Sequence, residues 1–230
     1  MPGGFALYLA FVIPPMLLGL AVQAWLRSTV ARYAADANDT GLSGAEVARR
    51  ILDRNGLHEV PIQQAPGGPL SDHYDPRSRS VHLSETVYAQ RSVTAAAIAA
   101  HEVGHAIQHQ RRFAPMQLRS AMFPAVSLAS NAWMFLLIGG AVTGALGLVK
   151  VGIALFAVAV LFHIVTLPVE FDASRRAMNQ LRELGLVGAG ETAGARKVLT
   201  AAAMTYVAGA LAAIAQLAYF AMVFLGNNRD

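Results

Sequence analysis

Residues 92–110 read SVTAAAIAAHEVGHAIQHQ and place two histidines four positions apart in an alanine-rich segment. Alanine has the highest helix propensity, and Ser92 can cap the N-terminus of a helix that begins at the next residue. In such a helix His101 and His105 are separated by about one turn, so both imidazoles project from one face. The stretch therefore predicts a helix that presents His101, Glu102 and His105 together.

This spacing is the zinc-binding pattern His-Glu-x-x-His, in which two imidazoles bind one ion beside a glutamate. Zinc lowers the pKa of a coordinated water toward about 7, so Glu102 as general base can move its proton to a leaving amine. The chain has no cysteine, which leaves histidines and carboxylates as ligands. We predict one Zn²⁺ per chain, with a solvated polar helix face as the alternative, although burying these groups without partners would be costly.

A catalytic zinc site needs a third protein ligand and an open fourth position. His109 lies about 12 Å along the helix axis from His101, too far to share the ion, and we expect it at a solvated helix end. Glu170 and Asp172 are better placed, in LPVEFDASRR at residues 167–176, directly after a long apolar run. We predict Glu170 as the third ligand.

The residues next to Glu170 in the chain predict the local helix and the groups that support the ligands. Pro168 can open a new helical stretch there, and Asp172 or Arg175 can support the ligands from behind. The alternative is that the two carboxylates only favour a helix N-terminus, or pair with Arg175 and Arg176.

The composition predicts a membrane protein that is mainly α-helical. The chain has 230 residues, of which 55% are hydrophobic and 14% charged, against about 25% charged in an ordinary soluble domain. Crossing a bilayer takes about 20 apolar residues. Four runs without Asp, Glu, Lys or Arg reach or nearly reach that length: residues 1–26, 120–149, 151–169 and 198–228.

These runs predict five segments with different roles. Residues 1–26 and 199–227 are expected to be the first and fourth transmembrane helices, and residues 120–169 a transmembrane hairpin that turns near Gly147 to Lys150. Residues 27–119 form the catalytic part with the motif helix, and residues 170–198 carry the third ligand.

The basic residues predict the orientation. Of the 18 Lys and Arg residues, 16 lie in the two polar segments, and such residues are retained on the cytoplasmic side. Both segments should therefore be cytoplasmic, with the termini outside. Topology also accounts for the high pI, so we expect no nucleic-acid partner.

Local patterns predict the elements of the first polar segment. Ser43-Gly44-Ala45-Glu46 has the form of a capping box at the start of a short amphipathic helix. The Pro- and Gly-rich stretch from Pro61 to Pro69 suggests a loop. Residues 72–83 suggest a β-hairpin whose turn begins at Asp75-Pro76.

Four blocks of the chain together resemble the YugP-like family of neutral zinc metallopeptidases of bacterial membranes. They are GAEVA at 44–48, DHYDP at 72–76, AHEVGHAIQ at 100–108 and LPVEFDAS at 167–174. The resemblance covers nearly the whole chain. It implies a multi-pass protein of the plasma membrane with a zinc peptidase site.

The arrangement is also similar to that of the HtpX and CAAX prenyl proteases, which implies a gluzincin-like domain. In those proteins the third ligand is the Glu of a Glu-x-x-x-Asp helix, which Glu170 matches, but Ser174 occupies the position of the Asp. Asp172 is then a candidate to replace that carboxylate. The resemblance further implies that an extended substrate adds to the edge of a strand before the motif helix, here Ser80 to Ser84.

Two interpretations of different class remain. The first is a peptidase at the cytoplasmic face of the membrane whose partners are the lipid bilayer and peptide or protein substrates, among them membrane proteins. In that interpretation His73 or Arg175 can stabilise the oxyanion, although a structural role suits each equally well. The second is a non-catalytic scaffold or partner-binding protein with a structural metal.

Overall fold

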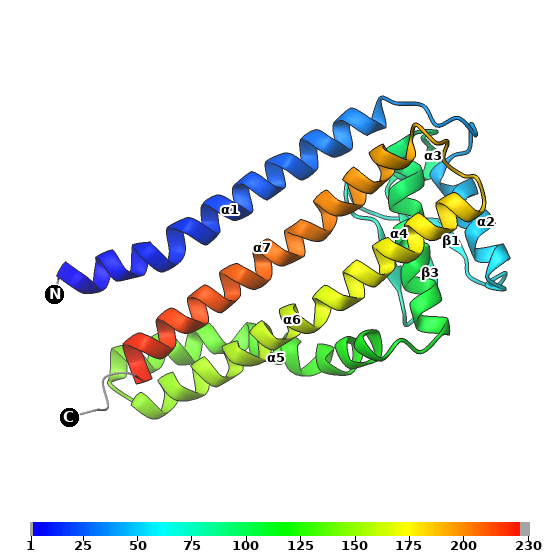
Figure 1. Ribbon diagram of the computed structural model, residues 1–230. Coiled ribbons are helices and arrows are strands. Elements are labelled where there is room, and N and C mark those ends of the chain that lie inside the picture. Colours follow the sequence, from blue (N-terminus) through cyan, green and yellow to red (C-terminus); the bar gives the residue numbers. More distant parts are fainter. Residues whose placement is uncertain (1, 226–230) are drawn as a thin grey trace. The chain divides into compact units, whose positions relative to one another are not determined.

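The computed structural model describes residues 2–225, which form long helices and one small sheet (Figure 1). The elements in chain order are α1 (Pro2–Ala34), α2 (Gly44–Arg54), β1 (Ile62–Gln64), β2 (His73–Asp75), β3 (Ser80–Leu83), α3 (Glu85–Ala89), α4 (Val93–Gln110), α5 (Ala114–Thr143), α6 (Leu146–Glu183) and α7 (Thr192–Leu225).

Four of the described helices are long and apolar enough to cross a membrane. They contain Ala6–Ala34, Ala114–Thr143, Leu146–Glu183 and Thr192–Phe224. The expected mainly helical chain with four spans is therefore confirmed by length and composition. Where each helix enters the bilayer stays a prediction, and residues 1, 226 and 227 of the predicted spans lie outside the described residues.

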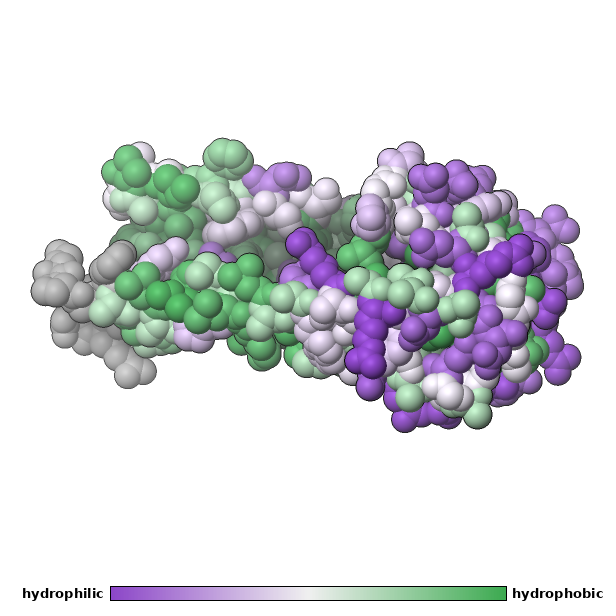
Figure 2. Space-filling model, turned by 90° about the horizontal axis from the view of Figure 1, so that it is seen from above, coloured by the Kyte–Doolittle hydropathy of each residue, from purple (hydrophilic) through white to green (hydrophobic). Residues whose placement is uncertain are grey.

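The chain divides into two compact units. Unit 1 comprises the described parts of Met1–Val22, Gln117–Leu167 and Thr205–Asp230, and unit 2 comprises Gln23–Met116 and Pro168–Met204. In Figure 2, hydrophobic residues gather on the surface of the long helices, whereas hydrophilic residues dominate where unit 2 is seen. This contrast fits a membrane part and a water-exposed part.

Unit 1 is held together by aromatic and aliphatic side chains from α5, α6 and α7. The Trp133 ring lies 4.5 Å from that of Phe156 and 5.9 Å from that of Phe220, measured between centroids. Such tilted pairs add to the free energy of apolar burial. The three rings therefore join three helices of the unit.

The turn between α5 and α6 lies earlier than predicted. The expected turn near Gly147 to Lys150 is wrong, because α6 already begins at Leu146. Gly144 adopts a φ of +72° and ends α5, a left-handed conformation that glycine adopts at little cost.

Unit 2 contains a three-stranded sheet in the order β1-β3-β2, with β1 parallel and β2 antiparallel to β3. The predicted hairpin is confirmed as β2 and β3. The loop expected from Pro61 to Pro69 is wrong in part, because Ile62–Gln64 forms β1. As a result β3 is the central strand, and the substrate edge expected at Ser80 to Ser84 is wrong.

The predicted helix starts of unit 2 are confirmed. Ser43 and Glu46 form a reciprocal capping box at α2, and the Ser92 hydroxyl accepts from the Ala95 amide at the start of α4. Helices α2 and α4 contact each other and share a core with β3. Its fully buried side chains include Ile51, Leu52, Val81, Leu83, Val103 and Leu181.

Helix α6 continues through Pro168 rather than beginning there. The expectation that Pro168 opens a new helical stretch is wrong, because residues 146–183 form one helix. Proline lacks an N–H and removes one internal hydrogen bond, yet the helix is unbroken around it. Glu170 therefore stands on the same helix as the apolar run before it.

Candidate metal centre

The predicted site depends on a close approach between α4 and α6. A Cβ atom placed on Gly104 would lie 2.7 Å from the carbonyl oxygen of Ala173, so a residue with a side chain would clash with the backbone of α6. The glycine inside the motif therefore lets the backbones of the two helices touch. His101 and His105 flank this contact on α4, and Glu170 stands one turn before it on α6.

The structure brings the three predicted ligands together. Glu170 Oε2 lies 3.2 Å from His101 Nε2 and 3.6 Å from His105 Nε2, and the three ligand atoms lie within 4.8 Å of one another. The Glu170 side chain is only 2% exposed. Two imidazoles and one carboxylate of this geometry fit the donor set of a catalytic zinc site, which leaves a fourth position open.

The other nitrogen of each imidazole has a partner of its own. His101 Nδ1 lies 3.2 Å from the Ser174 hydroxyl, and His105 Nδ1 lies 3.0 Å from Gln108 Oε1. When Nδ1 carries the hydrogen and donates it, Nε2 is unprotonated and its lone pair can bind a metal. Both Nε2 atoms therefore face Glu170 in a form suited to coordination.

The orientation of the Gln108 amide is fixed by two acceptors. Its Nε2 donates to the Val169 carbonyl oxygen at 2.8 Å and to Asp172 Oδ2 at 2.9 Å, and Gln108 is completely buried. Because both donors of the amide are used on α6, its carbonyl oxygen faces His105. A buried amide with all these partners is a stable positioning element.

Asp172 reaches the site through Gln108. Asp172 was expected to support the ligands, and it lies behind His105 through Gln108, whereas Ser174 is the residue beside His101 Nδ1. The carboxylate also accepts from Arg175, and from Arg176 Nε at 2.6 Å. Two guanidinium groups thus compensate a carboxylate that is only 5% exposed.

Glu102 is buried on the motif helix and is 7% exposed. Burial raises the pKa of its carboxyl, and the charges of His101 and His105 oppose that shift. A raised pKa moves the carboxyl toward the range in which a general base can both take and return a proton.

Burial and neighbouring groups shift the pKa of His105 in directions opposite to those at Glu102. Burial lowers the pKa of His105, but the hydrogen bond and charge of Glu170 outweigh burial, so the net pKa is raised. A carboxylate beside an imidazole favours the protonated ring. In the metal-free protein a proton can therefore occupy the His105 imidazole, where it would compete with a metal ion.

The remaining candidates lie on the hairpin and on α6. His73 Nδ1 lies 2.9 Å from the Ser71 carbonyl oxygen, and its ring stacks on His82 with centroids 4.6 Å apart. The Arg175 side chain is 70% exposed and contacts Asp172. An oxyanion role for His73 or Arg175 stays a prediction.

His109 lies in the last turn of α4 as expected, but it is less solvated than we expected. It is half-buried, and the Tyr74 hydroxyl lies 2.8 Å from its Nδ1. Burial raises the pKa of Tyr74 to about 12, so the phenol stays protonated and can donate. This hydrogen bond ties β2 to the end of the motif helix.

Reasoning from the sequence missed the roles of Gln108 and Ser174. Gln108 is one turn beyond His105 and Ser174 one turn beyond Glu170, spacings at which helical residues share a face. The available signal was a polar residue one helical turn beyond a predicted ligand, on the same face of the helix.

Comparison with known proteins agrees with this geometry. A family model described as "Putative neutral zinc metallopeptidase" matches residues 8–225. The "Putative membrane protease YugP" of Bacillus subtilis (strain 168) is 45% identical over 224 residues, which cover 97% of this chain and 99% of that protein. No solved structure shows a significant match.

Proposed function

This chain belongs to the neutral zinc metallopeptidase family, and we propose that it is a metalloendopeptidase embedded in a membrane, with His101, His105 and Glu170 as zinc ligands. One observation carries the proposal. Two imidazole Nε2 atoms meet a single oxygen of Glu170, while the buried Glu102 stands between the two histidines on the same helix. A scaffold with a structural metal has no need of that fourth residue.

In the proposed hydrolysis of a peptide bond, each residue of the site has a separate role. Zinc, when bound, lowers the pKa of water and polarises a carbonyl. Glu102 takes the proton of the attacking water and delivers it to the nitrogen of the leaving amine. Ser174 and Gln108 hold the two imidazoles in orientation, so the ligands need no rearrangement when the substrate binds.

The substrate chain is proposed to bind along the outer edge of β2. This strand contacts the motif helix, whereas β1, at the other edge of the sheet, contacts α2. The Val81 amide donates to the Pro61 carbonyl on the β1 side, and Tyr74 lies opposite Val81 in the antiparallel register. Alternation along a ladder therefore directs the N–H and C=O of Tyr74 outward.

This edge gives a specific expectation for substrates. One substrate residue can exchange two main-chain hydrogen bonds with Tyr74, which gives affinity with little sequence preference. N-methylation of one residue removes the N–H that would pair with Tyr74. It should therefore abolish cleavage only at the peptide bond whose hydrolysis requires that residue to lie opposite Tyr74. Equal effects of methylation at every position would contradict binding at this edge.

The site is proposed to face the cytoplasm in a bacterial plasma membrane and to act on membrane or misfolded proteins. The support is the distribution of charge, since 16 of 18 basic residues lie in the two polar segments. A cysteine introduced at exposed Arg77 should be shielded from impermeant maleimides in intact cells. Labelling from outside would reverse the orientation.

The decisive experiment combines metal content with cleavage. The purified protein should contain about one zinc, lost in His101→Ala and Glu170→Ala. Glu102→Gln should keep the zinc and lose cleavage by a factor of about 10²–10⁴, and Glu59→Gln, at an exposed position, is the matched control. Undiminished cleavage by zinc-loaded Glu102→Gln would remove Glu102 from its role and favour the structural-metal alternative.

A further inference from the structure

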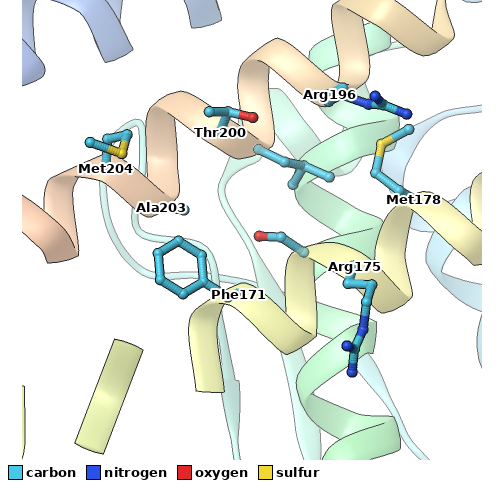
Figure 3. Close-up of a pocket in the computed structure, with 9 residues that line it drawn as sticks. Phe171, Arg175, Met178, Arg196, Thr200, Ala203 and Met204 are labelled. Carbon is cyan, nitrogen blue, oxygen red and sulfur yellow. The ribbon is translucent and has the colours of Figure 1, made fainter. Parts of the chain in front are cut away.

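A pocket opens between α6 and α7 within unit 2 and has a volume of about 190 Å³ (Figure 3). Its walls are mostly apolar. The hydrophobic side chains that line it are Phe171, Met178, Leu199, Ala203 and Met204. In Figure 3 the ring of Phe171 points across the gap toward Ala203.

The pocket shares a wall with the metal centre. Ser174 lines it, and the hydroxyl of the same residue lies 3.2 Å from His101 Nδ1. Phe171 follows the ligand Glu170 directly in the chain. A group in the pocket is therefore separated from a metal-ligating imidazole by one serine side chain.

The size and lining of the pocket select one kind of occupant. An apolar cavity of about 150 Å³ can hold benzene, so this pocket accepts one side chain of the size of leucine or phenylalanine. Met178 and Met204 are flexible and adapt to irregular shapes. A basic side chain would lose its hydration against these walls, and no acidic residue among those described lines the pocket to compensate it.

Electrostatics add a second selection at one end of the pocket. Figure 3 shows Arg196 and Met178 at one end, and Phe171 and Met204 at the other. Arg196 is exposed, whereas the guanidinium of Arg175 points away from the pocket and is bound to Asp172. The positive charge of Arg196 therefore complements an acidic group beside the apolar occupant and repels a basic one.

We propose that this pocket is a substrate subsite, which holds an aliphatic or aromatic side chain next to the scissile bond and favours an acidic over a basic neighbour. The inference rests on the proposed peptidase function and names its substrate class. It differs from the binding of the main chain at β2, because it concerns the side chain and involves α6 and α7.

The test is a cleavage profile of the detergent-solubilised, zinc-loaded protein on a peptide library. Ala203→Leu narrows the pocket and should reduce kcat/KM for leucine and phenylalanine relative to alanine by about 10–100-fold. Met204→Ala widens it and should shift the preference toward larger side chains. Ala212→Leu, on the same helix outside the pocket, is the control and should leave the profile unchanged.

Arg196→Gln tests the charge preference separately. It should reduce the ratio of cleavage of Glu-flanked to Lys-flanked peptides by about two- to fivefold at low salt, whereas Lys197→Gln, the neighbouring exposed cation, should not. Zinc content is measured for every variant, so loss of the metal is not mistaken for altered specificity.

The outcomes separate the two proposals. Cleavage by the wild type with a profile that neither Ala203→Leu nor Met204→Ala changes would overturn the subsite and leave the peptidase intact. If Ala203→Leu and Met204→Ala change the response of the enzyme to phosphatidylglycerol vesicles but leave the cleavage profile unchanged, the pocket binds lipid and the subsite is overturned. No cleavage of any peptide by the zinc-loaded wild type would overturn both.

Discussion

The amide nitrogen of Gln108 donates to Asp172 Oδ2 at 2.9 Å, and this hydrogen bond determines which end of the amide faces His105. Neither residue is one of the predicted ligands, yet together they couple α6 to the second histidine of α4. If the triad binds zinc as proposed, this coupling makes the zinc affinity depend on residues that do not touch the metal.

Gln108→Met should weaken zinc binding without removing a ligand. The thioether has nearly the length of the amide but cannot accept from His105 Nδ1–H, so the imidazole loses its orientation. The dissociation constant for zinc should rise about 10- to 100-fold, as measured by competition with a chelating dye. Gln63→Met, at an exposed position of β1, should bind zinc as the wild type does; equal affinities for all three proteins would contradict the positioning role.

Ser174 offers a graded test at His101. Ser174→Ala removes the oxygen that lies 3.2 Å from His101 Nδ1 and should weaken zinc binding about tenfold. Ser174→Asp places a carboxylate there and should restore or exceed the wild-type affinity, because a charged acceptor makes a stronger hydrogen bond. If Ser174→Asp bound zinc more weakly than Ser174→Ala, His101 would not be oriented from this side.

Gly104→Ala should separate α4 from α6. The new methyl group would meet backbone atoms of Ala173, which cannot move as a flexible side chain can. We expect a loss of about 1–3 kcal/mol in the free energy of unfolding together with loss of zinc, measured by thermal unfolding in detergent and by metal analysis. At Gly139, where no atom lies within 4 Å of the added Cβ, alanine should be neutral or stabilising, and the same result at Gly104 would contradict the close contact.

Zinc affinity should depend on pH through His105. Zinc binds the neutral imidazole, and the pKa of His105 in the metal-free protein is raised by Glu170. Protons therefore begin to displace zinc at a higher pH than for an exposed histidine, and below that pKa the association constant should fall about tenfold per pH unit for each proton bound. Titrations between pH 5.5 and 8 measure the slope; a constant affinity over this range would contradict the raised pKa.

The helices and the ligand triad follow largely from local signals. The charge-free runs, the caps at Ser43 and Ser92, and the hairpin at Asp75-Pro76 depend on residues close in the chain, and each expected element is present. Glu170 was predicted from its place directly after the third apolar run, although its partners His101 and His105 are about 70 positions away in the chain, and the family resemblance pointed to the same residue.

The failures of prediction concern contacts that no local pattern encodes. Ile62–Gln64 is a strand only because β3 lies beside it, so its Pro-rich flanks suggested a loop. The order of the sheet, and with it the available edge, depends on that pairing. Pro168 is tolerated inside α6 because the surrounding residues are already helical, which overrides its tendency to break a helix.

The division of unit 2 into two stretches of chain also has a consequence during biosynthesis. Gln23–Met116 leaves the ribosome before α5 and most of α6, whereas Glu170 follows them. The nascent chain therefore contains only two residues of the candidate triad, His101 and His105, until α5 and most of α6 have been synthesised. In the membrane peptidase proposed above, the site is complete only after the hairpin has been made, so a chain that stalls before that step has no assembled centre with which to cleave its neighbours.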